Sequence, residues 1–270
     1  MKTAVITGAS RGVGRAAAEA LAREGWRLIL NCRSRFDALD QVAAALAEQT
    51  EVTAIHGPID EAVLSKHLGI DLNAFTSVCE EALDHIKEYA NVSDPFDRRT
   101  RIAEDSADQL LLINNGGIST FHLAQEVTDA ELEEMLDANL KTMFRTTRAM
   151  IPYLLKVGKG AVINISSVWG QDGASMESVY SMTKGGINAF TRALGKELAP
   201  NHIPVNALAL GCVDTDMNAW LSPEDREALE AEIPYGRMAT PEEAAEMIVL
   251  LAKAPAYLTG QIITMDGGWI

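Results

Sequence analysis

Cysteines, aromatic residues and basic residues are all scarce in this sequence, and two of these shortages exclude classes of protein. The 270 residues include three cysteines, far apart and odd in number. We therefore expect reduced thiols in a cytoplasmic protein, not a disulfide framework. The formal net charge is −15, which argues against nucleic acid and anionic membranes as partners, because both bind through a cationic surface.

Long apolar runs and metal-ligand patterns are also missing. The sequence contains no run of about 18 apolar residues, so we expect no membrane span. We also find no basic-then-apolar leader before the first expected strand. The five histidines do not lie at metal-ligand spacing from cysteines or carboxylates, so we expect no metal site. What is present is 47% hydrophobic residues, enough to form the core of one large domain.

The order of apolar patterns predicts the fold class. Helical patterns alternate with strand patterns near 3–7, 27–32, 52–56, 110–114, 161–165, 204–208 and 261–264. Such alternation is typical of an α/β fold with a doubly wound parallel sheet (Rossmann fold), covered by helices on both faces. A ligand then binds at the carboxyl ends of the strands. No linker or repeat divides the chain, so we predict a single domain over 1–270.

A glycine-rich turn directly follows the first expected strand. The segment GASRGVG at 8–14 leads from that strand into an alanine-rich helix. Glycines let the backbone approach a pyrophosphate, and the N–H groups and dipole of the following helix favour its negative charge. A glycine-rich loop alone can be only a turn, but its place between a strand and a helix favours phosphate binding.

Tyr180 and Lys184 are four residues apart in a helical pattern, so both lie on one face of the helix. A lysine ammonium beside a tyrosine hydroxyl favours the phenolate and is expected to lower a pKa that is normally about 10. Tyr180 would then give a proton to a carbonyl oxygen or take one from an alcohol. The spacing alone is weak evidence, because both residue types are common on helix surfaces.

Together these motifs resemble the short-chain dehydrogenase/reductase family, and the resemblance covers nearly the whole chain. The motifs that carry it are TGASRGVG at 7–14, NNGG at 114–117, Asn139, ISS at 165–167, the Tyr180/Lys184 pair, VNA at 205–207, Gly211, DTDM at 214–217, LTGQ at 258–261 and DGG at 266–268. Several motifs in family order are far more specific than any one of them. The general pattern is similar to the 3-oxoacyl carrier-protein reductase subgroup.

The resemblance implies a role for each matching residue. Tyr180 is the acid–base group, Lys184 lowers its pKa and bonds the nicotinamide ribose, and Ser167 bonds the substrate oxygen. Ser166 is the alternative serine, but the interval of thirteen residues to Tyr180 favours Ser167. Asn139 would support a water chain from Lys184 toward solvent. Cofactor contacts are expected from Gly8, Ser10, Arg11, Gly12, Val13, Gly14, Arg33, Ser34, Asn114, Gly116, Tyr180, Lys184, Gly211, Val213 and Thr215.

The end of the second expected strand favours NADP(H) over NAD(H). An acidic residue there would bond a ribose 2′-hydroxyl and repel a 2′-phosphate. In the resemblance Cys32 occupies about that place, Arg33 follows it, and Arg11 lies in the glycine loop. Two cations near one phosphate indicate NADP(H). The alternative is that both arginines are only solvated.

Three positions depart from the family pattern. Leu210 replaces the proline that usually precedes Gly211, and Gly116 stands where alanine is usual. Neither change removes a chemical group, and we treat both as tolerated. Pro58 stands at about the position that commonly carries an adenine-binding aspartate, and Asp60 is a candidate substitute through a shifted loop.

Between the third and fourth expected strands the chain exceeds the family norm by roughly 25 to 30 residues, beyond usual connection lengths. We therefore expect an insertion within 61–109. Apolar residues in 75–89 are spaced for a helix with one apolar face, and the charged stretch 94–101 follows. The insertion either packs on the scaffold as an added helix with a solvated loop, or forms a subunit contact or covers a neighbouring active site.

The expected function is hydride transfer between NADP(H) and a carbonyl compound or secondary alcohol. Specificity elements are expected at 169–179 and 217–235, where Trp220, Leu221 and Tyr235 would supply an apolar wall. A small ketone or alcohol and a 3-oxoacyl thioester both remain open as substrates.

Other functions use the same residues. Epimerisation or dehydration through a transient ketone needs the same groups, and a noncatalytic NADP(H) sensor could use the same fold. The resemblance also implies a homotetramer or homodimer assembled through the helices that carry Asn139 and Tyr180.

Overall fold

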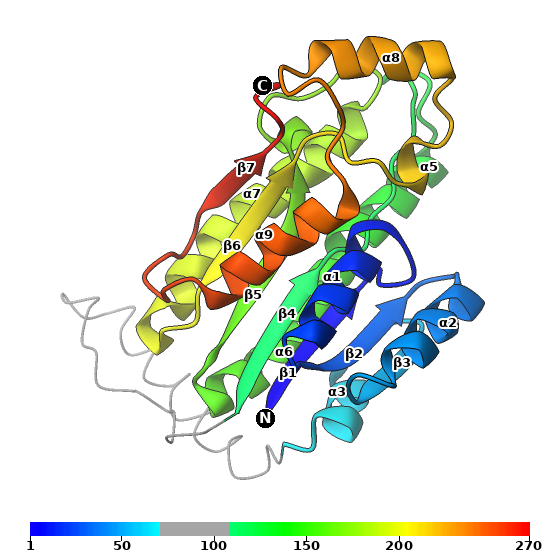
Figure 1. The fold of residues 1–270 in the computed structure, drawn as a ribbon. Coiled ribbons are helices and arrows are strands. Elements are labelled where there is room, and N and C mark those ends of the chain that lie inside the picture. The colour runs from blue at the N-terminus through cyan, green and yellow to red at the C-terminus, as the bar shows by residue number, and fades with distance from the viewer. Residues whose placement is uncertain (71–107) are drawn as a thin grey trace, which may run out of the picture.

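The structure is a computed structural model, and it describes residues 1–70 and 108–270. Seven strands form one sheet in the order β3-β2-β1-β4-β5-β6-β7, and every neighbouring pair is parallel. The strands are β1 (Lys2–Thr7), β2 (Arg27–Cys32), β3 (Val52–His56), β4 (Gln109–Asn114), β5 (Gly160–Ser167), β6 (Val205–Leu210) and β7 (Ile262–Met265) (Figure 1). The predicted α/β fold with a doubly wound parallel sheet is confirmed, and the predicted strands agree to within two residues at each end.

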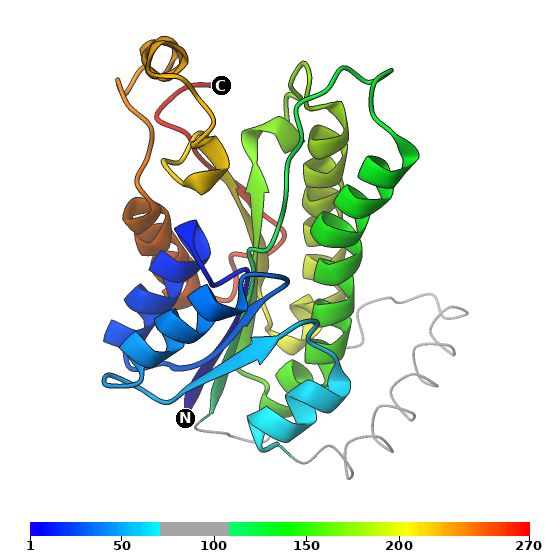
Figure 2. The same ribbon diagram turned by 90° about the vertical axis from the view of Figure 1, so that its right-hand side faces the viewer.

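Helices cover both faces of the sheet (Figure 2). One face carries α1 (Gly12–Arg23), α2 (Phe36–Leu46) and α9 (Pro241–Lys253). The other carries α3 (Glu61–Leu68), α6 (Thr142–Val157) and α7 (Ser178–Leu198). Strands buried on both sides read as continuous apolar runs, as β1, β2 and β4 do. Alanines dominate the buried face of α1, and their small side chains let α9 pack closely against it.

The order in which successive strands are added to the sheet reverses between β1 and β4. β2 and β3 extend to one side of β1, while β5, β6 and β7 extend beyond β4. In doubly wound sheets a crevice forms at this switch point, outside the carboxyl ends of the strands. Helix α8 (Pro223–Glu232) and the segment before it lie above this end of the sheet (Figure 1).

Helices α5 (Asp129–Leu136) and α6 join without a loop, through a π-helical segment at Asp137–Lys141. Thr128 begins α5 with a capping box, in which its side chain and that of Glu131 each bond the other's backbone N–H. A π-helical turn inside an α-helix shifts the faces of the flanking residues and is frequent at functional sites. Asn139 lies in this π segment.

Part of the predicted insertion is described. Helix α3 lies within 61–109 and ends at Gly69, whose left-handed φ of 67° is typical of a helix C-terminus. The helix predicted at 75–89 and the charged stretch 94–101 lie outside the described residues. Within the ranges that the structure covers, no helix is long and apolar enough to cross a membrane.

Candidate active site

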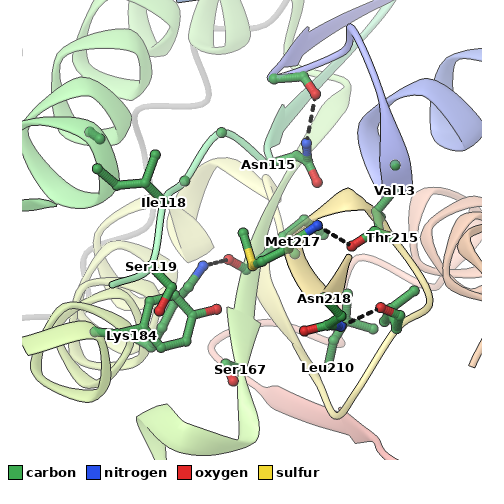
Figure 3. A pocket seen from close by; sticks show the side chains of 18 of the residues that line it. Val13, Asn115, Ile118, Ser119, Ser167, Lys184, Leu210, Thr215, Met217 and Asn218 are labelled. Carbon is green, nitrogen blue, oxygen red and sulfur yellow. Dashed lines mark hydrogen bonds between the residues drawn. The ribbon is translucent and has the colours of Figure 1, made fainter. Parts of the chain in front are cut away.

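A cavity of about 1310 Å³ opens at the carboxyl ends of the central strands (Figure 3). It brings together most of the predicted site residues: Gly8, Ser10, Arg11, Gly12, Val13, Arg33, Ser34, Gly116, Ser167, Tyr180, Lys184, Gly211, Val213 and Thr215. Arg33 follows β2, and Ser167 ends β5, three strand spacings away in the sheet order. Three spacings are about 14 Å, a span that suits an extended dinucleotide.

The glycine loop after β1 forms a tight backbone cradle. Gly8 has a φ of 66°, which few other residues adopt. A Cβ added at Gly14 would lie 2.3 Å from the Gly8 carbonyl oxygen and 2.5 Å from Asn115 Nδ2, so no side chain fits there. Arg11 occupies the N-cap position of α1 and makes no side-chain cap, which leaves the first N–H groups of the helix for an anion. These features fit the pyrophosphate of a dinucleotide.

The loops after β1 and β4 are joined by hydrogen bonds. The Thr7 hydroxyl accepts from the backbone N–H groups of Asn115 at 3.0 Å and Gly116 at 3.1 Å. Asn115 Nδ2 in turn donates to the Gly8 carbonyl at 3.0 Å. Asn115 therefore fixes the width of the cradle, and it lines the cavity together with Gly116 (Figure 3).

Asn114 does not take the cofactor-binding place predicted for it. Its side chain is buried away from the cavity and donates to Thr147 Oγ1 at 2.9 Å and Asn164 Oδ1 at 2.8 Å. Successive strand residues point to opposite faces. Because Asn114 ends β4, its side chain ties the strand to β5 and α6, while the next residue reaches the cavity.

Three arginines line the cavity near the end of β2. Arg11 bonds Asp216 at 3.0 Å, Arg35 approaches the same carboxylate at 3.9 Å, and Arg33 lies 3.6 Å from Glu134. The predicted residues Arg11 and Arg33 both line the cavity, and their contact with a phosphate stays a prediction. Arg35 was missed, although it follows Arg33 by two residues in the same loop.

The adenine contact predicted for Asp60 stays a prediction. Its carboxylate caps α3 by accepting from the Val63 N–H at 2.9 Å, and it does not line the cavity. Pro58 and Gly57 line that side instead. Cys32 ends β2, where its thiol lines the cavity, and burial raises its pKa above the ordinary value. A neutral thiol neither repels a phosphate nor accepts a strong hydrogen bond from a ribose.

Tyr180, Lys184 and Ser167 meet where β5 ends against α7. Tyr180 and Lys184 lie one turn apart on the buried face of α7, and the Lys184 ammonium is 5.4 Å from the centre of the Tyr180 ring. Lys184 Nζ donates to the Ile165 carbonyl at 3.0 Å (Figure 3). The Ser167 and Tyr180 hydroxyls are hydrogen-bond partners. A carbonyl oxygen entering between the two hydroxyls would meet two donors.

The expected lowering of the Tyr180 pKa is not found. Burial raises this pKa above its ordinary value, the charge of Glu177 raises it further, and the hydrogen bond from Ser167 offsets only part of the increase. Burial also lowers the pKa of Lys184 to about 8. The Lys184 charge alone would lower the Tyr180 pKa, but burial disfavours the charged form of both side chains.

Asn139 holds the loop after β4 against α7. Its Oδ1 accepts from the Ile118 N–H at 2.8 Å, and its Nδ2 donates to the Ile118 carbonyl at 2.9 Å and to Thr183 Oγ1 at 3.0 Å. Asn139 does not line the cavity. In this arrangement it positions the cavity wall, and the predicted water chain from Lys184 stays a prediction.

Ser166 and Ser167 differ in what their hydroxyls contact. The Ser166 hydroxyl donates to Asn188 Oδ1 at 2.7 Å and is buried against α7. Ser167 is the serine that bonds Tyr180, and its oxygen also accepts from the Trp169 N–H at 3.2 Å. The geometry therefore favours Ser167 over Ser166 as the serine beside a substrate oxygen.

The segment after β6 forms another wall. A Cβ added at Gly211 would lie 2.8 Å from Asp266 Cα, so the loops after β6 and β7 can touch only because residue 211 is glycine. Thr215 begins a short 3-10 turn by accepting from the Met217 N–H at 3.4 Å (Figure 3). Leu210, in the place of the usual proline, packs into the core beside the cavity.

Aromatic side chains line the opposite part of the cavity. Trp220 packs against Phe121 with ring centres 4.8 Å apart, and Trp169 packs edge-on against Trp269 at 4.9 Å. The sequence predicted Trp220 in this wall but missed Phe121 and Trp269, which are distant in sequence.

The other two predicted wall residues differ in outcome. Leu221 lines the cavity, whereas Tyr235 does not and is 66% exposed. Ser119 was missed, whereas Glu177 lies within the predicted segment 169–179 but was not singled out. Both line the cavity, and the Ser119 hydroxyl donates to Glu177 Oε1 at 2.5 Å. Across residues 1–70 and 108–270, no group of three or more His, Cys, Asp or Glu side chains is placed to hold a metal ion.

Comparisons with known sequences identify the family. A family model described as short chain dehydrogenase matches residues 2–68, and one described as enoyl-(acyl carrier protein) reductase matches residues 98–270. The uncharacterized oxidoreductase YmfI of Bacillus subtilis is 36% identical over 99% of this chain and 98% of its own length. The 3-oxoacyl-[acyl-carrier-protein] reductase FabG of Aquifex aeolicus is 34% identical over 99% of this chain and 96% of its own.

Solved structures are similar over the same length. A 3-oxoacyl-[acyl-carrier protein] reductase from Brucella melitensis has a TM-score of 0.76 at 26% identity, covering 100% of this chain and 91% of its own. A protein provisionally assigned as an NAD(P)-dependent gluconate 5-dehydrogenase from Beutenbergia cavernae, with NADP bound at low occupancy, has a TM-score of 0.76 at 32% identity. It covers 99% of this chain and 96% of its own.

The sheet, the glycine cradle and the Tyr180 cluster define an oxidoreductase of the Rossmann fold. The chain belongs to the short-chain dehydrogenase/reductase family, since the relatives above exceed 30% identity over nearly its whole length. The predicted resemblance to this family, and to its 3-oxoacyl carrier-protein reductase-like members, is confirmed.

Proposed function

We propose that this protein transfers a hydride between NADP(H) and a carbonyl compound or its secondary alcohol, with Tyr180 as the acid–base group. One observation carries the proposal: Ser167, Tyr180 and Lys184 meet in the same cavity as the glycine cradle. A cofactor held in the cradle and extended toward β5 would reach the two hydroxyls. Of the similar proteins, YmfI is named as an oxidoreductase and FabG as a reductase.

The chain's own groups supply binding and proton transfer. The backbone of the glycine loop and the start of α1 would hold the pyrophosphate. Gly211, Val213 and Thr215 line the wall proposed for the nicotinamide end. Bound NADPH would supply the hydride that reaches the carbonyl carbon. Tyr180 gives its hydroxyl proton to the carbonyl oxygen, which becomes the alcohol, and takes that proton back in the reverse reaction.

Ser167 and Lys184 assist the proton transfer in different ways. Ser167 holds the substrate oxygen at Tyr180, so that the reacting atoms meet in one geometry. Lys184 is buried within the same wall, and an ammonium group there would favour the Tyr180 phenolate. We propose that Lys184 also bonds the nicotinamide ribose.

NADP(H) is favoured over NAD(H) by the charges around the end of β2. Arg11, Arg33 and Arg35 line this part of the cavity, and Cys32 stands where an aspartate would repel a 2′-phosphate. Phosphate attracts guanidinium groups through paired, charge-assisted hydrogen bonds. A solved relative that is 32% identical contains NADP.

A 3-oxoacyl thioester is the second candidate substrate, because several relatives are named as 3-oxoacyl-[acyl-carrier-protein] reductases. An acidic carrier protein would dock on a basic surface, whereas this chain has a net charge of −15. We therefore favour a small carbonyl compound. Comparing kcat/KM for a small ketone panel with that for a 3-oxoacyl thioester separates the two candidates.

The direct test is Tyr180→Phe, which removes one hydroxyl and keeps the ring. Loss of turnover with intact NADPH binding and intact secondary structure is expected, because the ring packing is unchanged and only the proton donor is lost. Saturable NADPH binding with no turnover by the unaltered protein would instead support a noncatalytic sensor.

We also propose a homotetramer or homodimer that uses α6 and α7. Phe144 and Met182 are half exposed on these helices, at 47% and 51%, and Phe144 packs edge-on against Phe190. Apolar side chains grouped on an outer face favour a protein contact. Sedimentation of the purified protein as a monomer would contradict this assembly. A cytoplasmic location stays a prediction.

A further inference from the structure

Glu177 is a buried carboxyl group whose place the proposed proton transfer does not explain. It is only 9% exposed, it lines the active-site cavity, and it precedes Tyr180 by three residues. Glu177 also occupies the N-cap position of α7, where an acidic side chain would normally bond the helix N–H groups. It makes no such cap. The side chain is directed to the cavity wall instead.

Two donors hold the carboxylate in that wall. The Ser119 hydroxyl, from the loop after β4, donates to Glu177 Oε1 at 2.5 Å, and the Trp169 indole donates a second hydrogen bond. Ser119, Ser167 and Lys184 all line this cavity (Figure 3). An ionised carboxylate accepts about four hydrogen bonds, so acceptor capacity remains for a ligand.

The backbone that presents Glu177 is strained. Met176, directly before it, has a φ of 64°, a left-handed conformation that costs a residue with a side chain about 1–2 kcal/mol. The strained residue is held by the N–H of His122, which donates to the Met176 carbonyl at 2.8 Å. Strain of this kind persists where the surroundings enforce it, and it clusters at functional sites.

Within residues 1–70 and 108–270, no basic side chain is among the groups that shift the pKa of Glu177. Burial raises this pKa, and the hydrogen bonds from Ser119 and Trp169 oppose that increase. The charge also raises the pKa of Tyr180. A buried carboxylate without a cation costs free energy, and this one also disfavours the Tyr180 phenolate. A ligand group that donates a hydrogen bond to Glu177 would offset that cost.

We propose that Glu177, positioned by Ser119, accepts a hydrogen bond from a hydroxyl on the carbon next to the substrate carbonyl. This inference rests on the proposed function. Glu177 and Tyr180 line the same cavity, and the charge of Glu177 acts on Tyr180. A substrate oxygen bonded to Tyr180 would therefore bring the adjacent carbon toward Glu177. The aromatic wall of Trp169, Trp220 and Phe121 accommodates an apolar substituent. The substrate class is therefore hydroxyketones with an apolar group, and a carboxylate at the same carbon is repelled.

The test compares two ketones that differ in one donor. 2-Hydroxyacetophenone can donate a hydrogen bond to Glu177, whereas 2-methoxyacetophenone cannot, and both carry an oxygen beside the carbonyl. A hydrogen bond to a charged group corresponds to roughly a 10- to 100-fold effect. We expect the unaltered protein, with NADPH, to show a kcat/KM higher by about that factor for the hydroxyketone.

Variants show whether Glu177 causes the preference. Glu177→Leu removes the acceptor and should bring the ratio of the two kcat/KM values close to one. Glu177→Gln keeps the shape of the side chain and one acceptor oxygen but removes the charge, so it should give an intermediate ratio. It also provides a test if the leucine variant misfolds. Glu246→Gln, an exposed change on α9, is the matched control and should leave the ratio unchanged.

The possible results separate this inference from the proposed function. Turnover of both ketones at equal kcat/KM overturns the role of Glu177 and leaves hydride transfer intact. A preference that is unchanged in both Glu177 variants overturns it as well. Failure of the unaltered protein to reduce any ketone contradicts the proposed function, and this inference with it.

Discussion

The proposed NADP(H) site implies that Asp216 competes with the cofactor phosphate for two arginines, so its removal should strengthen NADPH binding. The carboxylate bonds Arg11 at 3.0 Å and approaches Arg35 at 3.9 Å. These side chains are about half exposed, at 45%, 56% and 58%, and exposed ion pairs of this kind are worth roughly 0.2–1 kcal/mol. Asp216→Asn releases both arginines and removes a charge that repels the phosphate.

The 3.9 Å contact adds little, so the gain should be about 0.5–1 kcal/mol, or a two- to fivefold lower Kd for NADPH. Fluorescence titration measures it, with NADH as the comparison ligand because it lacks the 2′-phosphate. The gain should shrink in high salt, which screens exposed charges. Glu48→Gln, an exposed change of equal charge between α2 and β3, should have no effect. An NADPH Kd that rises or stays constant in Asp216→Asn refutes the competition.

Three further changes test other parts of the site. Gly14→Ala places a Cβ 2.3 Å from the Gly8 carbonyl oxygen. NADPH titration should therefore show lost binding, and thermal unfolding should show a lower Tm. Normal NADPH binding would contradict the role of the glycine loop in binding the cofactor. Ser167→Ala should lower kcat by roughly 100-fold, the effect of losing one donor to a reacting oxygen, whereas Ser166→Ala should mainly lower the Tm; the reverse result would exchange their roles. Glu177→Gln removes a charge that raises the pKa of Tyr180, so the pKa of Tyr180 should fall. Alcohol oxidation needs the phenolate, and its rate should therefore reach half its maximum at lower pH. An unchanged pH profile of the oxidation rate would contradict the coupling between Glu177 and Tyr180.

The strand and glycine patterns were sufficient to predict the fold. Strands buried on both faces give continuous apolar runs, and a parallel sheet sends their carboxyl ends to one edge. The positions of Gly8, Ser167 and Tyr180 in the cavity followed from that rule and from the family resemblance. The need for glycine at position 14 has a steric reason, since a Cβ added there would collide with the turn.

Some site predictions depend on side-chain directions that the sequence does not specify. Asn114 and Asn115 are adjacent and identical, but only the second reaches the cavity, because strand residues alternate between faces. The Asp60 carboxylate could bond either a ligand or the N–H groups at the start of α3, and in the structure it accepts from the Val63 N–H. Tyr235 lies within the predicted specificity segment but points to solvent.

Other features required the tertiary structure. The pKa of Tyr180 depends on its burial and on Glu177, and neither is visible in the Tyr180/Lys184 spacing. Glu177 could have been noticed as an acidic residue one turn before Tyr180, yet its inward direction depends on the left-handed Met176. Ser119 is 58 residues away from its partner in sequence.

The most direct test of the central claim is the initial rate of NADPH and NADH oxidation over a panel of ketones, hydroxyketones, keto sugars and a 3-oxoacyl thioester. It should be measured for the unaltered protein and for Tyr180→Phe. We predict turnover that prefers NADPH and falls by roughly 10²- to 10⁴-fold in the variant, the usual contribution of a general acid. Turnover that is nearly unchanged in Tyr180→Phe would contradict the proposed mechanism.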